Sequence, residues 1–133
     1  MTIGAVADTH AAIWYVWGDP RMPPTARAVF DNLAAAGFQV GVSSISLVEI
    51  VYLIEKRRID PATLEMVLDT LDLGGLLEEV PVDRSIIPAL AAIPRDQVPD
   101  MPDRIIAATA ARLGVPLISR DRKIRASSVA TVW

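Results

Sequence analysis

Four acidic residues are spaced along the chain as a metal site in a small α/β protein requires, and these are Asp8, Glu49, Asp103 and Asp121. The first and the last follow apolar runs at 3–7 and 116–119. Because the carboxyl ends of parallel strands share one edge of an open sheet, these acids can converge there. Crowded carboxylates repel one another unless a hard cation neutralises them, and Mg²⁺ and Mn²⁺ prefer oxygen ligands. The spacing therefore indicates metal-assisted hydrolysis of a phosphodiester.

Two of these acids also have a simple structural explanation. Asp8 stands between a strand and a helix, where an aspartate commonly caps the helix. Asp121 fits an ordinary turn residue within Ser119-Arg120-Asp121-Arg122. Either acid alone is ambiguous, and the metal-site interpretation rests on the set.

The other two acids lie near helix starts. Glu49 is the last residue of a capping box if the helix begins at Ser46. If the helix begins at Ser44, Glu49 falls further in, where a carboxylate among apolar neighbours needs a partner. Asp103 competes with Asp100 for the N-cap of the next helix, and the acid that does not cap is available to a metal or a water.

Other polar and aromatic side chains are assigned smaller roles. The single histidine, His10, fits the start of a helix better than catalysis, and with no cysteine it cannot form a typical zinc site. Trp14, Tyr15 and Trp17 are expected to pack rather than stack on a ligand. Two pairs of polar side chains lie beside the acids and fit phosphate or water contacts as well as structural roles: Thr9 and Ser119, and Arg104 and Arg120.

The composition of the chain limits the classes of protein to which it can belong. The chain has 133 residues, 52% of them hydrophobic, which is enough for one domain with a real core. It has no cysteine, no run of about 20 apolar residues that could span a bilayer, and no signal-peptide pattern. We therefore expect a cytoplasmic protein without disulfides. The net charge of −3 attracts no nucleic acid globally, although basic residues cluster at 56–58 and 120–125.

Short apolar runs alternate with longer helical patterns, which is typical of βαβ units and a parallel sheet. We expect strands at 3–7, 39–43, 77–82, 116–119 and 129–133, and helices at 11–17, 23–36, 44–57, 61–73 after an Asp60 cap, after Asp83 with an interruption at Pro88, and 103–113. The prediction is a single three-layer α/β domain over 1–133, with a mostly parallel central sheet of four or five strands flanked by helices.

Four stretches of the chain resemble the PIN-domain ribonucleases, and within them the VapC-like toxins of bacterial and archaeal toxin–antitoxin pairs. They are VADTHAAIW at 6–14, VSSISLVEI at 42–50, DMPDRIIAATA at 100–110 and GVPLISRD at 114–121. The stretches occur in the family's order and span almost the whole chain. One departure is Met101, where the toxins usually carry an aromatic or other bulky residue.

The resemblance implies a PIN-like fold and a toxin that cleaves RNA with one or two Mg²⁺ or Mn²⁺ ions. It places the family's acids on Asp8, Glu49, Asp103 and Asp121, with Asp100 as an additional candidate. It also implies a small antitoxin protein as partner and a homodimer, with no membrane association.

Three other classes fit less well. A haloacid-dehalogenase-type phosphatase needs an acid two residues after Asp8, where this chain has His10. A receiver domain needs an aspartate after its third strand and a lysine after its last. The remaining alternative is a PIN-like module that binds protein or RNA without catalysis, and the presence of all four acids argues against it.

Overall fold

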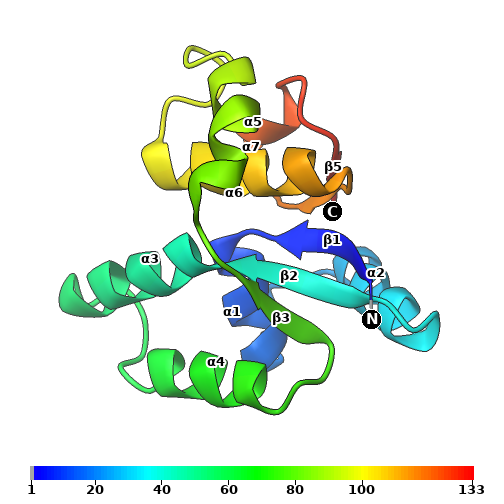
Figure 1. Ribbon diagram of the computed structural model, residues 1–133. Coiled ribbons are helices and arrows are strands. Elements are labelled where there is room, and N and C mark those ends of the chain that lie inside the picture. The colour runs from blue at the N-terminus through cyan, green and yellow to red at the C-terminus, as the bar shows by residue number, and fades with distance from the viewer. Residues whose placement is uncertain (1) are drawn as a thin grey trace.

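A five-stranded parallel sheet runs through the middle of the computed structural model, which describes residues 2–133 (Figure 1). The strands are β1 (Ile3–Ala7), β2 (Gln39–Ser43), β3 (Leu77–Val80), β4 (Leu117–Ile118) and β5 (Thr131–Val132). Their order in the sheet is β3-β2-β1-β4-β5. The chain thus moves outward from β1 to β3 and then returns to the other side of β1. Ligands of open parallel sheets bind where the strand order reverses in this way.

Helices cover both faces of the sheet and make it the middle of three layers. They are α1 (Thr9–Trp17), α2 (Pro24–Ala35), α3 (Ser44–Glu55), α4 (Thr63–Asp72), the short 3₁₀ helix η1 (Arg84–Ile86), α5 (Ile87–Ala92), α6 (Met101–Leu113) and α7 (Arg122–Arg125). In Figure 1, α5, α6 and α7 lie on one face of β1, and α1 and α4 lie on the other. The predicted three-layer α/β architecture is confirmed.

The alternating side chains of β1 explain how one strand supports two cores. Ala5 and Ala7 pack in the apolar cluster that includes residues of α1, α2 and α4. Val6, between them, packs in a second cluster with Ile106 and Ala107 of α6. Ala5, Val6 and Ala7 are almost fully buried. Because both faces of the strand are covered, its sequence is a continuous apolar run, as is usual for central parallel strands.

Most predicted elements are confirmed, and their ends differ for identifiable reasons. Helix α1 begins at Thr9, two residues before the predicted start, because Asp8 serves as its N-cap. Helix α6 likewise begins at Met101 rather than Asp103, because Asp100 caps it and Pro102 is tolerated in a first helical turn.

Three details were wrong or missed. Asp60 does not cap α4: its carboxylate accepts a hydrogen bond from the Ala62 amide within a turn, and the helix begins at Thr63. Strand β3 ends at Val80 instead of residue 82. The short helix α7 was not predicted at all.

Residues with a positive φ follow both α1 and α3. Gly18 ends α1 in the left-handed conformation, with a φ of 64° that glycine adopts at little cost. Arg57 follows α3 with a φ of 57°, which is unfavourable for a residue with a side chain.

Among residues 2–133 no helix is long and apolar enough to cross a bilayer.

Candidate active site

A cavity of about 270 Å³ opens at the carboxyl edge of the sheet, where β1 and β4 lie side by side. Its lining residues are Asp8, Thr9, His10, Glu49, Asp100, Asp103, Arg120 and Asp121. The four acids singled out from the sequence and the additional candidate Asp100 therefore share one cavity. They come from the end of β1, the middle of α3, the start of α6 and the turn after β4.

Asp8 is held from two sides. Its Oδ1 accepts a hydrogen bond of 2.8 Å from the Ala11 amide, which is the N-cap contact of α1. Burial, with only 9% of the residue exposed, raises the pKa of Asp8, and the charge of Asp121 raises it further. A hydrogen bond with Ser119 and the nearby His10 oppose this rise in pKa. Asp8 is thus a helix cap and a cavity carboxylate at the same time.

Glu49 projects from the second turn of α3, because Ser43 is the N-cap of that helix. The capping-box alternative beginning at Ser46 is therefore wrong. The Thr9 hydroxyl lies 2.5 Å from Glu49 Oε1 and 2.9 Å from the Ser46 hydroxyl. Since the only hydroxyl proton of Thr9 goes to the carboxylate, Ser46 donates to Thr9. Burial raises the pKa of Glu49, and the contact with Thr9 works against that rise.

Asp100 and Asp103 divide their roles as the sequence suggested. Asp100 caps α6, since its Oδ1 accepts a hydrogen bond of 3.0 Å from the Asp103 amide. The N-cap of α6 is Asp100 and not Asp103, whose carboxylate lines the cavity with the other acids.

The pKa of Asp103 reports how closely the acids approach one another. Burial is the largest cause of a rise from 3.8 to about 7, and the charges of Asp100, Glu49, Asp121 and Asp8 add to it. A position in the first turn of a helix ordinarily favours a negative charge. Burial and repulsion outweigh that preference here.

Asp121 caps α7, the helix missed from the sequence. Its Oδ1 accepts hydrogen bonds of 3.0 Å from the amides of Lys123 and Ile124. Asp121 is therefore a helix cap rather than the ordinary turn residue that was the alternative, and it also lines the cavity. A cap engages one carboxylate oxygen, so capping and a role at the cavity do not exclude each other.

The donor set suits a hard cation by residue type. Carboxylate oxygens are the ligands of Mg²⁺ and Mn²⁺, and their mutual repulsion is what a cation relieves. Within residues 2–133, however, no three histidine, cysteine or acidic side chains are arranged to hold one ion. Asp8, Asp100 and Asp121 each engage one carboxylate oxygen in a helix cap. Binding of one ion by three of these acids would require some of their side chains to rotate.

Two residues outside the predicted metal ligands also line the cavity: His10, which was assigned to a helix start, and Arg120, for which a phosphate contact and a structural role were both left open. His10 lies in the first turn of α1, is exposed, and lowers the pKa values of Asp8 and Glu49. Its position two residues after Asp8 was the available signal. Arg120 lines the cavity as well, whereas Arg104 donates to the backbone carbonyl of Ile93 at 2.9 Å.

The aromatic residues of α1 pack, as predicted. Tyr15 stacks on Phe30 with ring centroids 4.3 Å apart, and Trp14 is 3% exposed. Trp17 is the exception, since 40% of it is exposed while its Nε1 donates to the Thr63 hydroxyl at 3.1 Å.

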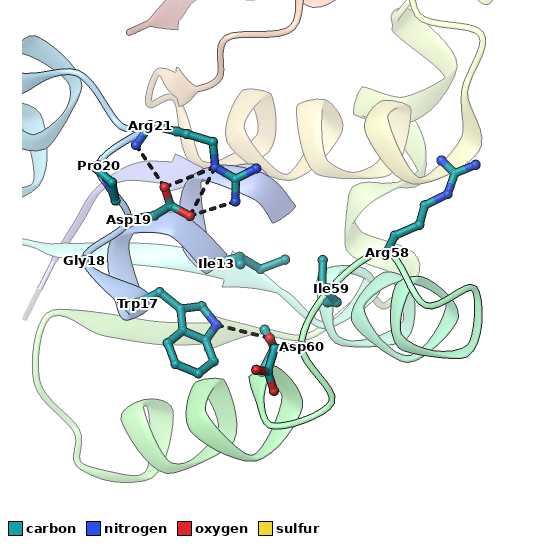
Figure 2. Close-up of a pocket in the computed structure, with 10 residues that line it drawn as sticks. Ile13, Trp17, Gly18, Asp19, Pro20, Arg21, Arg58, Ile59 and Asp60 are labelled. Atoms are coloured by element: carbon teal, nitrogen blue, oxygen red, sulfur yellow. Dashed lines mark hydrogen bonds and ion pairs between the residues drawn. The ribbon is translucent and has the colours of Figure 1, made fainter.

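A larger hollow of about 430 Å³ lies beside Trp17, between the end of α1 and the loop before α4 (Figure 2). Its acids are already satisfied: Asp19 pairs with Arg21, and Asp60 closes a turn. None of the four acids predicted to bind metal lines it. The acids singled out from the sequence therefore line the smaller cavity and not this hollow.

The PIN domain profile matches residues 5–129. The chain belongs to the PIN domain family. This PIN domain is 29% identical over 130 residues to ribonuclease VapC22 of Mycobacterium tuberculosis, covering 95% of each chain. Among solved structures it is similar to VapBC2 of Rickettsia felis bound to a promoter DNA fragment (TM-score 0.68, 17% identity, 98% of each chain). It is also similar to DNA-bound VapBC of Salmonella typhimurium (TM-score 0.68, 19% identity, 99% of this chain and 98% of that one). The predicted family is confirmed, and the solved structures share its fold.

Proposed function

We propose that this PIN domain is a divalent-metal-dependent endoribonuclease and the toxin of a toxin–antitoxin pair. The observation that carries the proposal is the group of five carboxylates in one cavity, where burial and then the charges of the other four raise the pKa of Asp103. Strongly perturbed pKa values cluster at functional sites, and a bound cation would relieve the repulsion among these carboxylates. The relative VapC22 is named a ribonuclease, and the solved relatives pair such a chain with a second protein.

Asp8, Glu49, Asp103 and Asp121 are the residues that hold the metal in this proposal, with Asp100 beside them. A bound Mg²⁺ or Mn²⁺ supplies a water of lowered pKa and neutralises charge on the leaving oxygen. The chain itself positions the ligands: Thr9 orients Glu49, and Ser119 orients Asp8. No side-chain nucleophile is required, which agrees with a sequence that has no cysteine.

Incubation of the purified protein with total cellular RNA tests the nuclease activity. Discrete fragments are expected with Mg²⁺ or Mn²⁺ and none with a chelator. Asp8→Asn and Asp103→Asn should abolish cleavage, and Asn at position 8 retains the cap of α1.

The matched control is Asp83→Asn. Asp83 caps η1 through the Ser85 amide in the same way but is exposed and lies outside the cavity. Cleavage should persist in this variant. Full activity in Asp8→Asn, or no cleavage by folded wild type in either metal, would overturn the assignment and favour a binding module.

Two further parts of the proposal concern partners. A cognate antitoxin is tested by expression: wild type should arrest growth, Asp8→Asn should not, and a small protein encoded beside the gene should restore growth and bind stoichiometrically. Unimpaired growth with a protein that is an active ribonuclease in vitro would remove the toxin role.

A homodimer is supported by apolar side chains exposed on α3. Val48, Val51 and Tyr52 are 38–58% exposed, and Met101 lies at the start of the neighbouring α6. Sedimentation equilibrium should give a dimer for wild type and a monomer for Tyr52→Glu. A monomeric wild type at micromolar concentration would refute this part.

A further inference from the structure

Arg120 occupies an unusual place for a cation in an acidic cavity. It lies in the turn between β4 and α7, next to Asp121, and lines the cavity together with all five acids. Yet it makes no ion pair within 4.0 Å with any of them. Among residues 2–133 the single ion pair joins Arg21 and Asp19.

An aromatic ring holds the Arg120 guanidinium instead. Its Cζ lies 4.5 Å from the centroid of the Trp14 ring, at the distance of a cation–π contact. The Trp14 ring is itself fixed, since it is buried and contacts Trp133 with centroids 6.0 Å apart. A guanidinium stacked on a ring keeps its N–H edges available, which an ammonium group cannot do in the same way.

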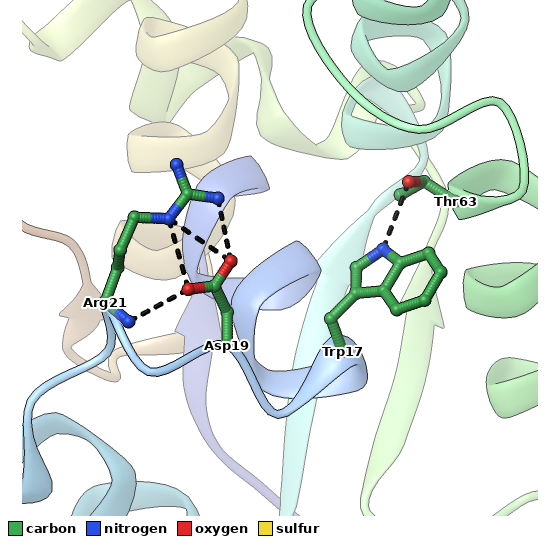
Figure 3. Close-up of polar contacts among 4 residues, drawn as sticks. All are labelled: Trp17, Asp19, Arg21 and Thr63. Carbon is green, nitrogen blue, oxygen red and sulfur yellow. Dashed lines mark hydrogen bonds and ion pairs between the residues drawn. The ribbon is translucent and has the colours of Figure 1, made fainter.

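A second arginine on the same ring provides an internal comparison. Arg21 Cζ lies 4.9 Å from the Trp14 centroid. Its donors are occupied, however, because its Nε and Nη2 atoms bind both oxygens of Asp19, the shortest contact being 2.7 Å (Figure 3). The Trp14 ring therefore carries one arginine neutralised by an acid and one, at the cavity, that is not.

We propose that Arg120, held on Trp14, binds a phosphate of the RNA strand next to the phosphate at the acids. The proposal rests on the proposed ribonuclease function. An acidic cavity alone repels a polyanion, and a cation in ion pairs with the acids would compete with the metal. A guanidinium held at the cavity but off the carboxylates avoids both problems, and its fork of donors matches phosphate oxygens.

Because this contact exists before and during cleavage, it contributes uniform binding, which changes KM and leaves kcat unaltered. Steady-state kinetics on a short oligoribonucleotide that wild type cleaves should show KM raised about tenfold in Arg120→Ala, the effect of losing one charge-assisted hydrogen bond or more. Arg120→Lys should recover only part of the loss, since lysine keeps the charge without the fork.

Arg21→Ala is the matched control, because Arg21 contacts the same ring while its donors are engaged by Asp19. Its KM should equal that of wild type. An unchanged KM in Arg120→Ala, or an equal rise in Arg21→Ala, would overturn the proposal.

A second measurement does not depend on cleavage. Binding of a short oligouridylate to Asp8→Asn should weaken with salt, and adding Arg120→Ala should reduce the slope of log K against log salt by about 0.7, the value for one phosphate contact on a single strand. An unchanged slope refutes the Arg120 contact. If wild type cleaves no RNA, the ribonuclease proposal fails by itself, and this slope still decides whether Arg120 binds phosphate.

Discussion

Replacing Asp103 by Asn should stabilise the metal-free protein at pH 8 and should do so by less than half as much near pH 5. The folded state raises the pKa of Asp103 from 3.8 to about 7, chiefly through burial and then through the neighbouring acids. Between those two pH values the folded state binds a proton that the unfolded state has lost. The free energy of unfolding therefore falls as pH rises through this window. Asn carries no charge and removes the dependence.

The structure sets the size of the effect. A shift of about 3 pKa units corresponds to a ceiling of about 4 kcal/mol. Asp103 is only partly buried, so solvent screening reduces this figure. Losing a negative charge in the first turn of α6 also costs about 0.3–1 kcal/mol. A net gain of about 1–2 kcal/mol at pH 8 is expected, or roughly 4–7 °C in Tm for a chain of this length.

Thermal unfolding followed by circular dichroism in chelator, at pH 8 and pH 5, measures the difference. Glu65→Gln is the matched control, because Glu65 occupies the first turn of α4 and is exposed outside the acidic cavity. It should lose a little stability through the helix dipole alone. If Asp103→Asn is no more stable than wild type at pH 8, the acids do not repel one another as argued.

Three other perturbations follow from the same structure. Mg²⁺ should raise the Tm more at pH 8 than at pH 6 in the same thermal assay, because the proton on Asp103 competes with the metal; an equal rise at both pH values would count against Asp103 as a ligand. Thr9→Val should lower kcat about tenfold and reduce the free energy of unfolding in urea by about 1–2 kcal/mol, since Glu49 loses its hydroxyl donor. An unchanged kcat and an unchanged free energy of unfolding would show that the contact is dispensable. Arg57→Gly should stabilise the fold by about 1 kcal/mol with activity unaltered, because Arg57 has a φ of 57°, and a lower urea midpoint would contradict this.

The sheet was predictable because parallel central strands carry their signal locally. The runs at 3–7 and 39–43 are confirmed residue for residue, and the acids that follow strands point to the edge where the strand order reverses. The choice between alternatives was not local. The capping box at Ser46 fails because α3 begins at Ser44 with Ser43 as its N-cap, and the side chain that contacts Glu49 belongs to Thr9, which lies 40 positions away in the sequence.

The parts that were missed depend on contacts between distant segments or on very short elements. Helix α7 has four residues, too few to show periodicity. The ring under Arg120 belongs to Trp14, more than a hundred residues earlier, so spacing carried no signal for it. From the sequence, a cap or a turn was weighed against a site role for Asp8 and Asp121, whereas in the folded chain both aspartates cap helices and also line the cavity.

This double use has a genetic consequence. Asp8, Asp100 and Asp121 each hold the start of a helix through one side-chain oxygen, and asparagine supplies that oxygen equally well. Every aspartate codon becomes an asparagine codon by changing its first base from G to A. If Asp8 and Asp121 hold the metal as proposed, a single transition at either position removes a ligand while the helix caps, and with them the fold, survive. Under selection against a harmful activity, full-length folded protein without that activity lies one mutation away.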